Sequence, residues 1–488
     1  MNLAGEWCGV GRVPGARRLI LSAAHVPFGL PIRYNGGMPT LTLTFSPTPL
    51  TLGLLREPQL CYVLLTVRAA GTCSARAVNW ALVADASRSM RIPIVDEAQF
   101  RTLVRHGGAQ EALVDGVPVW QLNGPVPPDV RAAAQSALDQ VAHALHTVVE
   151  RLDAQDRFAL IACAEEAVLL ARSTAGDQRA ELARGIARLK GLNLGEQTDL
   201  ARGIELGLHE LRRGRAGQRA ERLLLLTDGF TQRPEACLQL AGAAAAEGVT
   251  ICTIGLGGEF QVEVLTALAD RSGGRALFLR TIAEIPRAVA SELAAARTVA
   301  ARSVALRVAP APGVALRRAT RIRPSLTALF ESPSTDGAGA GPIDLHLGDL
   351  EAPAPAVLLL EFLAPPHAPG HAPLGQLVLT AEGVAAVQED LLVSYQASAP
   401  LPPLDVLDAA ARASAARLQR RALAALASSQ TAEAIRLLRA AATRLDDLGE
   451  RTLAEAARGQ AAALEHTGRA DSLAAKELAY ATRRLGEA

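Results

Sequence analysis

Between Val78 and about Ala296, apolar segments of strand length alternate with amphipathic segments of helix length. The predicted strands are almost continuously apolar and read VNWALVAD, RFALIACAE, RLLLLTD, VTICTIGLG and RALFLR. The predicted helices cover residues 129–152, 179–189, 199–213, 233–247, 260–272 and 282–298. Strands that are buried on both faces and connected by helices are typical of a doubly wound, mostly parallel sheet. We therefore predict an α/β domain over residues 76–297.

Short strand-like segments lie on both sides of this domain. Two of them, LTLTF and LCYVLLTV, precede residue 70, and six more follow Ser303. Short strands separated by Pro- and Gly-containing turns indicate a β-sandwich. We predict a sandwich over residues 300–397 that the strands of residues 38–75 join, so that the α/β domain is inserted in the sandwich or followed by it.

The two ends of the chain differ in character. After the SAPLPP linker, residues 404–488 are rich in Ala, Leu and Arg, and breaks near Ser428, Gly449 and Gly468 predict a domain of four helices. Residues 1–37 lack clear periodicity, so we treat them as an N-terminal extension for which Met1 and Met38 are both candidate translation starts.

Composition restricts the class of partner. The net charge is +1, with 49% apolar and 20% charged residues, so no overall field favours nucleic acid or an anionic membrane. The six cysteines are scattered without a C-x-x-C pair, which indicates buried thiols in a reducing compartment. No apolar run is long enough to span a membrane. We expect a cytoplasmic, bacterial protein.

Oxygen-bearing side chains follow the predicted strands at one edge of the sheet. Asp85, Ser87 and Ser89 follow VNWALVA, Thr198 lies in a Gly-containing loop before a helix, and Asp228 ends RLLLLTD. Ligands bind doubly wound sheets at this carboxyl edge. Three hydroxyls and two carboxylates, without His or Cys, suit a hard cation such as Mg²⁺. Because so few charges would leave the ion under-neutralised, we expect it to recruit an Asp or Glu from a protein partner.

These residues resemble the von Willebrand factor type A (vWA) domain and its metal-ion-dependent adhesion site. That family carries D-x-S-x-S after the first strand, a Thr in a later loop and an Asp after the fourth strand, and DASRS (85–89), Thr198 and Asp228 fill these positions. The resemblance implies a Rossmann-like sheet that binds Mg²⁺, with Mn²⁺ or Ca²⁺ as alternatives, and metal-mediated binding of a protein. We add Arg88, Thr227 and Trp120 as candidate partner contacts.

Residues 91–128 depart from the family pattern, in which the first helix starts soon after the motif. We predict a short helix over residues 96–106 and a hairpin that turns on Asp115–Gly116. Both ends of this insertion attach at the metal edge. We therefore expect it to pack beside the metal loops and to restrict which partners reach the ion.

Other interpretations of the same residues remain open. Asp85, Ser87 and Thr198 could simply cap helices, and Asp228–Gly229 could be an ordinary turn. We find no nucleophile–base set such as G-x-S-x-G or H-E-x-x-H, so we expect no enzyme. A metal-activated hydrolase and a structural scaffold whose metal only stiffens loops are the alternatives to a metal-dependent adaptor.

Overall fold

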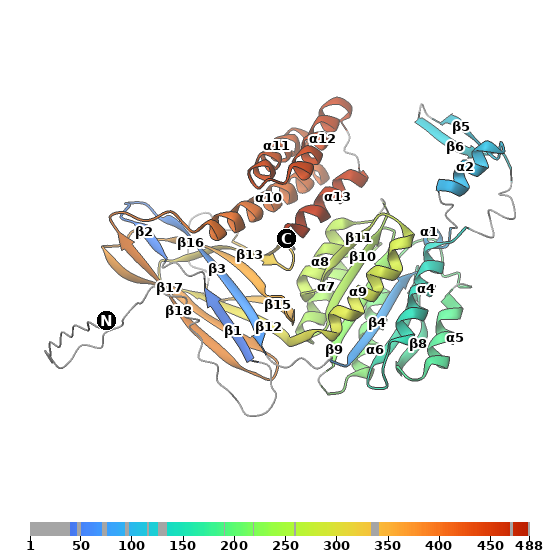
Figure 1. Ribbon diagram of the computed structural model, residues 1–488, viewed down its shortest axis with the longest axis horizontal. Coiled ribbons are helices and arrows are strands. Elements are labelled where there is room, and N and C mark those ends of the chain that lie inside the picture. Colours follow the sequence, from blue (N-terminus) through green and yellow to red (C-terminus); the bar gives the residue numbers. More distant parts are fainter. Residues whose placement is uncertain are drawn as a thin grey trace, which may run out of the picture.

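The computed structural model describes residues 40–486, except for residues 46–49, 71–75, 93–96, 115–116, 125–133, 190, 218, 258–259, 333–340 and 469–471. The described chain forms an α/β domain, a β-sandwich and a helical domain (Figure 1). The predicted fold class is confirmed. The predicted extension, residues 1–37, lies outside the described residues.

A six-stranded sheet forms the centre of the α/β domain, in the order β11-β10-β9-β4-β7-β8. All neighbouring strands are parallel except β7 and β8, which are antiparallel. The strands are β4 (Val78–Asp85), β7 (Arg157–Cys163), β8 (Ala167–Ala175), β9 (Ala220–Thr227), β10 (Thr250–Leu256) and β11 (Ala276–Leu279). The sequence prediction missed β8, an edge strand that is only partly buried and whose apolar run AVLLA is followed by the polar residues RST.

Helices cover both faces of this sheet. One face carries α4 (Ala137–Glu150), α5 (Arg179–Leu189) and α9 (Ile285–Arg297), and the other carries α6 (Leu200–Gly214), α7 (Pro234–Ala246) and α8 (Val262–Ser272). Strand β4 is buried throughout, because Trp80 and Leu82 face the first layer while Ala81 and Val83 face the second. Helix α4 begins later than predicted, at a capping box that Ser136 forms with Asp139.

Two five-stranded sheets form the sandwich, in the orders β1-β3-β16-β13-β14 and β15-β12-β17-β18-β2. Both contain strands from before and after the α/β domain, which is therefore inserted between β3 and β12. The strands are β1 (Thr40–Phe45), β2 (Thr51–Gly53), β3 (Gln59–Ala70), β12 (Val299–Pro310), β13 (Ala315–Arg323), β14 (Thr327–Glu331), β15 (Ile343–Glu351), β16 (Ala356–Ala364), β17 (Gly370–Ala381) and β18 (Val384–Gln396).

The helical domain connects the other two units. It comprises α10 (Leu404–Ala427), α11 (Thr431–Asp447), α12 (Arg451–Thr467) and α13 (Ser472–Arg483), with breaks near Ser428, Gly449 and Gly468 as predicted. Helix α10 packs on the outer face of β3 and β16, where Leu359 is fully buried. Helix α13 reaches the α/β domain, and its Tyr480 ring contacts the rings of Phe260 and Phe278.

The α/β domain meets the sandwich at the end of its sheet where β9 begins. The Arg222 guanidinium is buried there, 3.1 Å from a Glu351 carboxylate oxygen and 3.6 Å from one of Asp349. Beside this ion-pair cluster, the backbones of Gly273 and Gly348 touch, and both glycines have positive φ, 74° and 77°. A side chain at either position would collide with the opposite backbone, so this joint requires glycine.

The insertion after β4 forms the predicted elements, with α2 (Glu97–Arg105) followed by a hairpin of β5 (Ala109–Val114) and β6 (Val117–Leu122). Its placement differs from our expectation. Figure 1 shows these three elements on the side of the domain where β4 ends, but clearly separated from the sheet and its helices. The prediction that the insertion packs beside the metal loops is therefore wrong for its described part. Its apolar residues Leu103 and Ala109 are buried within the small unit itself.

A bilayer span requires a helix that is both long and apolar. None of the described helices combines the length and apolar character needed to cross a membrane.

Gly273→Ala should destabilise the protein strongly, because the new Cβ would meet the Gly348 backbone and the residue would keep a left-handed conformation. We expect a loss of roughly 2–4 kcal/mol in unfolding free energy, measured by urea denaturation. Gly383→Ala is the matched control, because its φ is 70° but no atom lies within 4 Å of the place that its Cβ would take. It should lose only about 1–2 kcal/mol. Equal losses would show that the Gly273–Gly348 contact does not constrain the joint.

Candidate metal site

The site begins with the parallel pairing of β4 and β9, which brings two polar strand ends together. Ala84 pairs with Leu226, so Asp85 lies beside Thr227, and Asp228 follows at the same edge. Asp85 and Thr227 are fully buried. The Thr227 hydroxyl donates a hydrogen bond of 2.6 Å to the Asp85 carboxylate.

The segment after β4 turns sharply around the Asp85 carboxylate. The Ser87 backbone N–H donates to Asp85 Oδ1 at 2.9 Å, and the Ser87 and Ser89 hydroxyls lie 3.2 Å apart. The Ser89 hydroxyl then donates to Asp228 Oδ1 at 2.8 Å. The single-turn helix α1 (Arg88–Arg91) follows, and its fully buried Met90 joins the core below.

Thr198 reaches the same carboxylate from the loop before α6. Its hydroxyl lies 3.3 Å from Asp85 Oδ1 and 3.2 Å from Oδ2. The loop after β9 supports it, because the Gln232 N–H donates to the Thr198 carbonyl and the Leu200 N–H donates to the Thr231 hydroxyl. Thr198 is thereby fixed to the strand end that carries Asp228.

The structure therefore brings all five predicted ligands into one hydrogen-bonded cluster. These residues are Asp85, Ser87, Ser89, Thr198 and Asp228. Asp85, Ser87 and Thr198 form a buried floor, whereas Ser89 is exposed and Asp228 is half-buried. The open side of the cluster thus faces solvent.

The candidate partner contacts behave differently from one another. Arg88 is exposed and forms an ion pair of 3.2 Å with Glu196, across to the Thr198 loop. The expectation that Thr227 contacts a partner is wrong, because its side chain is fully buried. Its hydroxyl instead positions Asp85. Trp120 lies in β6, and its side chain is outside the described residues.

The electrostatics of Asp85 favour a cation. Burial raises the pKa of Asp85, while hydrogen bonds from Thr227, Ser87 and Thr198 act in the opposite direction. Every hydrogen bond that it accepts within the described residues comes from a neutral hydroxyl or amide donor. Burying a carboxylate charge that only neutral donors stabilise costs free energy. A nearby metal ion would compensate this charge.

The donor set fits a hard divalent ion with few charged ligands. In the described part of the chain, no three His, Cys, Asp or Glu side chains gather in a group that could hold a metal. An ion at this cluster would therefore depend on hydroxyl oxygens and water as well as on Asp85 and Asp228. Such a ligand set agrees with the preference of Mg²⁺ for oxygen donors and retained water.

Sequence reasoning missed the residues that support the Thr198 loop. The Glu165 carboxylate accepts hydrogen bonds from the backbone N–H groups of Glu196 and Gln197, at 3.1 and 3.4 Å. Gly195 has φ 108°, and a Cβ there would collide with Glu165. Glu165 ends the predicted strand RFALIACAE, so its place at the same sheet edge was a signal that could have identified it.

Two apolar side chains border the cluster. Phe230, two residues after Asp228, is 60% exposed, and Ile92, after α1, is 52% exposed. The Lys476 ammonium of α13 lies 6.0 Å from the centre of the Phe230 ring and 4.7 Å from that of Phe260. The helical domain therefore reaches the loop that follows β9.

Comparisons with known proteins agree with this architecture. Residues 131–290 match the family model of the von Willebrand factor type A domain, and residues 404–488 match that of the Sll0103-like, C-terminal alpha-helical domain. The first match begins after the insertion and so excludes DASRS, although β4 is central to the same sheet.

Sequence identity to an individual curated relative is low. The chain is 26% identical over 268 residues to "Uncharacterized protein sll0103" of Synechocystis sp. (strain ATCC 27184 / PCC 6803 / Kazusa), a match that covers 54% of this chain and 61% of that protein. The chain thus spans about three fifths of the length of this curated relative.

Two solved structures share the fold over almost the whole chain. A von Willebrand factor type A protein from Catenulispora acidiphila has a TM-score of 0.69 and 16% identity, covering 93% of this chain and 99% of that one. The ArnB paralog VWA2 from Sulfolobus acidocaldarius has a TM-score of 0.51 and 14% identity, covering 92% and 99%. At these identities the likeness concerns the fold alone.

Thr227→Val should destabilise the metal-free protein, because it removes a hydroxyl donor from a buried carboxylate while keeping the side-chain shape. We expect a loss of about 1.5–3 kcal/mol in unfolding free energy, measured by urea denaturation in EDTA. Thr443→Val, on the exposed surface of α11, is the control and should change stability by less than about 0.5 kcal/mol. A Thr227→Val protein as stable as this control would contradict the positioning role of Thr227.

Proposed function

The chain contains a vWA domain, inserted in a β-sandwich and followed by a Sll0103-like helical domain, and from this we propose that it is a metal-dependent adaptor that binds a partner protein. vWA domains commonly act as metal-dependent interaction modules. The observation that carries the proposal is the cluster around Asp85, in which three loops present oxygen atoms on one solvent-facing edge. We propose no catalytic role.

The five clustered residues would hold the metal. Asp85, Ser87, Ser89, Thr198 and Asp228 offer only oxygen donors, which suits Mg²⁺ and also permits Mn²⁺ or Ca²⁺. When bound, the ion would supply a positive charge with a replaceable water, to which an Asp or Glu of the partner could bind. Thr227 and Glu165 would keep the ligand loops in place.

The surroundings of the cluster favour a protein as partner. Arg88 offers a charged group beside the cluster, and Phe230 and Ile92, which follow Asp228 and α1 in the chain, offer exposed apolar surface. Interfaces typically combine such apolar anchors with a few charged contacts. We therefore propose that the partner segment carries an acidic residue next to apolar ones.

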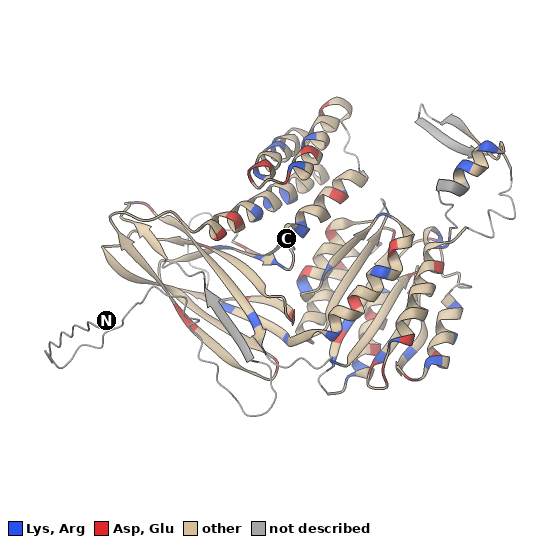
Figure 2. Cartoon of the chain, in the orientation of Figure 1, with Lys and Arg blue, Asp and Glu red and all other residues tan. Residues whose placement is uncertain are grey.

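Charge and cysteine chemistry bear on partner class and location. The net charge is +1, and Figure 2 shows the positions of basic and acidic residues interspersed along the helices, so we propose no nucleic-acid or membrane partner. Among the described residues, Cys61, Cys163, Cys237 and Cys252 are free and buried. Free thiols suit a reducing compartment, and we propose a cytoplasmic location.

Asp85→Ala should remove Mg²⁺ binding from a protein that remains folded, because it deletes the carboxylate at the centre of the cluster. We expect an affinity loss of at least about 100-fold in titration calorimetry, with an unchanged circular dichroism spectrum. Glu196→Gln is the control, since it removes a negative charge two residues from Thr198 without touching the cluster, and its affinity should stay within about threefold. Undiminished Mg²⁺ binding by an Asp85→Ala, Asp228→Ala double variant would show that the metal assignment is wrong.

Phe230→Ser should weaken partner capture without changing Mg²⁺ affinity, because Phe230 borders the cluster but supplies no ligand atom. We expect about tenfold lower recovery of the partner in Mg²⁺-containing pull-downs from the source organism, read by mass spectrometry. Leu401→Ser, in the linker and 86% exposed, is the matched apolar control and should not affect recovery.

A pull-down in EDTA and a turnover assay separate the adaptor from the two alternative functions. Recovery that is equal in Mg²⁺ and in EDTA would contradict the adaptor and favour a scaffold whose metal only stiffens loops. Turnover of phosphoester or peptide substrates by the purified protein, lost in Asp228→Ala, would instead identify a metal-activated hydrolase.

A further inference from the structure

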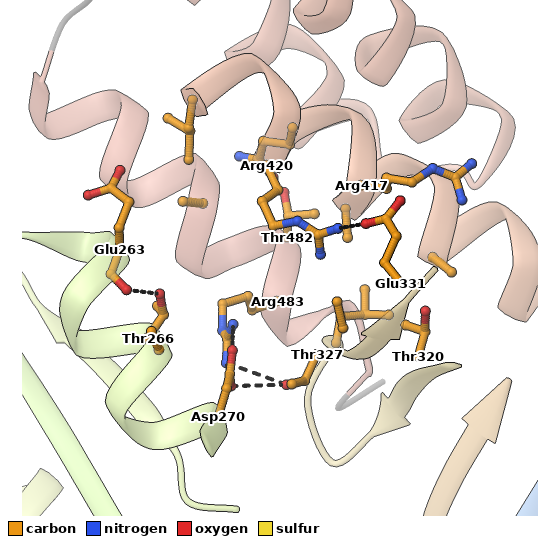
Figure 3. Close-up of a pocket in the computed structure, with 18 of the residues that line it drawn as sticks. Glu263, Thr266, Asp270, Thr320, Thr327, Glu331, Arg417, Arg420, Thr482 and Arg483 are labelled. Carbon is orange, nitrogen blue, oxygen red and sulfur yellow. Dashed lines mark hydrogen bonds and ion pairs between the residues drawn. The ribbon is translucent and has the colours of Figure 1, made fainter. Parts of the chain in front are cut away.

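A cavity of about 530 Å³ lies where the three structural units meet, away from the candidate metal site. Its walls come from α8 of the α/β domain, from β13 and β14 of the sandwich, and from α10 and α13 of the helical domain (Figure 3). This volume is within the range that small organic ligands occupy in proteins. The side chains on its walls indicate the chemistry of such a ligand.

Positive charge exceeds negative charge on the side formed by α10 and the sandwich. Arg318 forms ion pairs with two carboxylates, that of Glu331 at 3.2 Å and that of Glu361 at 3.0 Å. Arg420 lies 2.8 Å from Glu331, whereas the contact of Arg417 with Glu361 is longer, at 3.6 Å. Three guanidinium groups thus share two carboxylates.

Arg417 is the least well compensated of the three. Burial lowers the pKa of its guanidinium, and the neighbouring charge of Arg318 lowers it further. Across the cavity, Arg483 and Asp270 neutralise each other, with a contact of 2.9 Å, and Thr327 donates to the same carboxylate. Figure 3 shows this pair opposite Arg417 and Arg420, and Glu263 farther along α8, where it is exposed to solvent. An added anion would therefore be attracted to the Arg417 side.

A buried amide provides an independent sign of a missing acceptor. Gln419 lines the cavity from α10 and is only 5% exposed, yet its Nε2 atom has no hydrogen-bond partner among the residues that the structure describes. Buried amide donors are nearly always paired in native proteins. An oxygen atom of a ligand in the cavity would satisfy this donor.

The remainder of the wall is apolar. Leu329 of β14, Leu423 and Ala416 of α10 and Ala479 of α13 all line the cavity. Because residues 416, 420 and 423 recur at helical spacing, one face of α10 presents both a charge and apolar surface. We infer that this junction cavity binds a small organic anion with an apolar body, whose acidic group lies beside Arg417 and Arg420 and accepts a hydrogen bond from Gln419.

Such a ligand would touch all three units at once. It would contact α8, the β13–β14 hairpin and both α10 and α13, and so would stabilise their mutual arrangement increasingly as its concentration rises above its Kd. This inference does not depend on the metal site or on the proposed function.

The test uses 8-anilinonaphthalene-1-sulfonate, an organic anion whose fluorescence rises in apolar surroundings, with the full-length protein. We expect saturable binding at one site per chain, weakened about tenfold in Arg417→Gln and several-fold in Gln419→Met, because each removes one recognising group. Arg458→Gln, which removes an exposed guanidinium of α12 that pairs with Asp446, is the matched control and should bind as the unaltered protein does. Equal binding by Arg417→Gln and Arg458→Gln would overturn the inference.

Two further measurements keep the test decisive if Arg417→Gln does not fold. Ala424→Trp fills the cavity from an exposed position of α10 and should abolish the bound-state fluorescence. Decanoate should displace the probe at lower concentration than decanol, which has the same chain without the charge. Binding that survives Ala424→Trp would place the probe elsewhere, and equal displacement by the acid and the alcohol would contradict recognition of an anion.

Discussion

The parallel pairing of β4 with β9 is the constraint on which the candidate metal site depends. Because both strands run in the same direction and Ala84 pairs with Leu226, Asp85 and Thr227 end their strands side by side. The Ser87 backbone N–H and the Thr198 hydroxyl can then donate to one carboxylate from separate loops. Each of these loops is held by other contacts, from Met90 in the core to Glu165 beneath the Thr198 loop. The cluster is therefore formed by the fold rather than by any single motif.

The three units are joined in chemically different ways. The α/β domain meets the sandwich through a buried charge cluster at Arg222 and through the close contact of Gly273 with Gly348. It meets the helical domain through aromatic rings, where Tyr480 packs on Phe260 and Phe278. The first joint lies at the start of β9 and the metal cluster lies at its end, so the sandwich leaves the ligand loops accessible.

Much of this arrangement could be predicted from the sequence, because it is encoded locally. The continuous apolar strands identified the central sheet, and the oxygen side chains at their carboxyl ends identified the five clustered residues. What escaped prediction has two different causes. Strand β8 follows β7 after only three residues, and its short apolar run was not separated from that of β7, whereas the burial of Thr227 follows from β4, which is distant in sequence. The position of the insertion away from the sheet is not encoded by any local pattern in its sequence.

The insertion of the α/β domain also sets an order of assembly during synthesis. Strand β3 leaves the ribosome before the whole α/β domain, yet one of its edges pairs with β16, which is made much later. At roughly 5–20 residues per second, tens of seconds pass between the two strands. The α/β domain is continuous from β4 to α9, so most of its core is synthesised in that interval, and Ala479 and Tyr480 of α13 are added later. Until β16 is made, the edge of the apolar strand β3 that will pair with it stays open. The incomplete sandwich is therefore the stage of synthesis at which this protein is most exposed to aggregation.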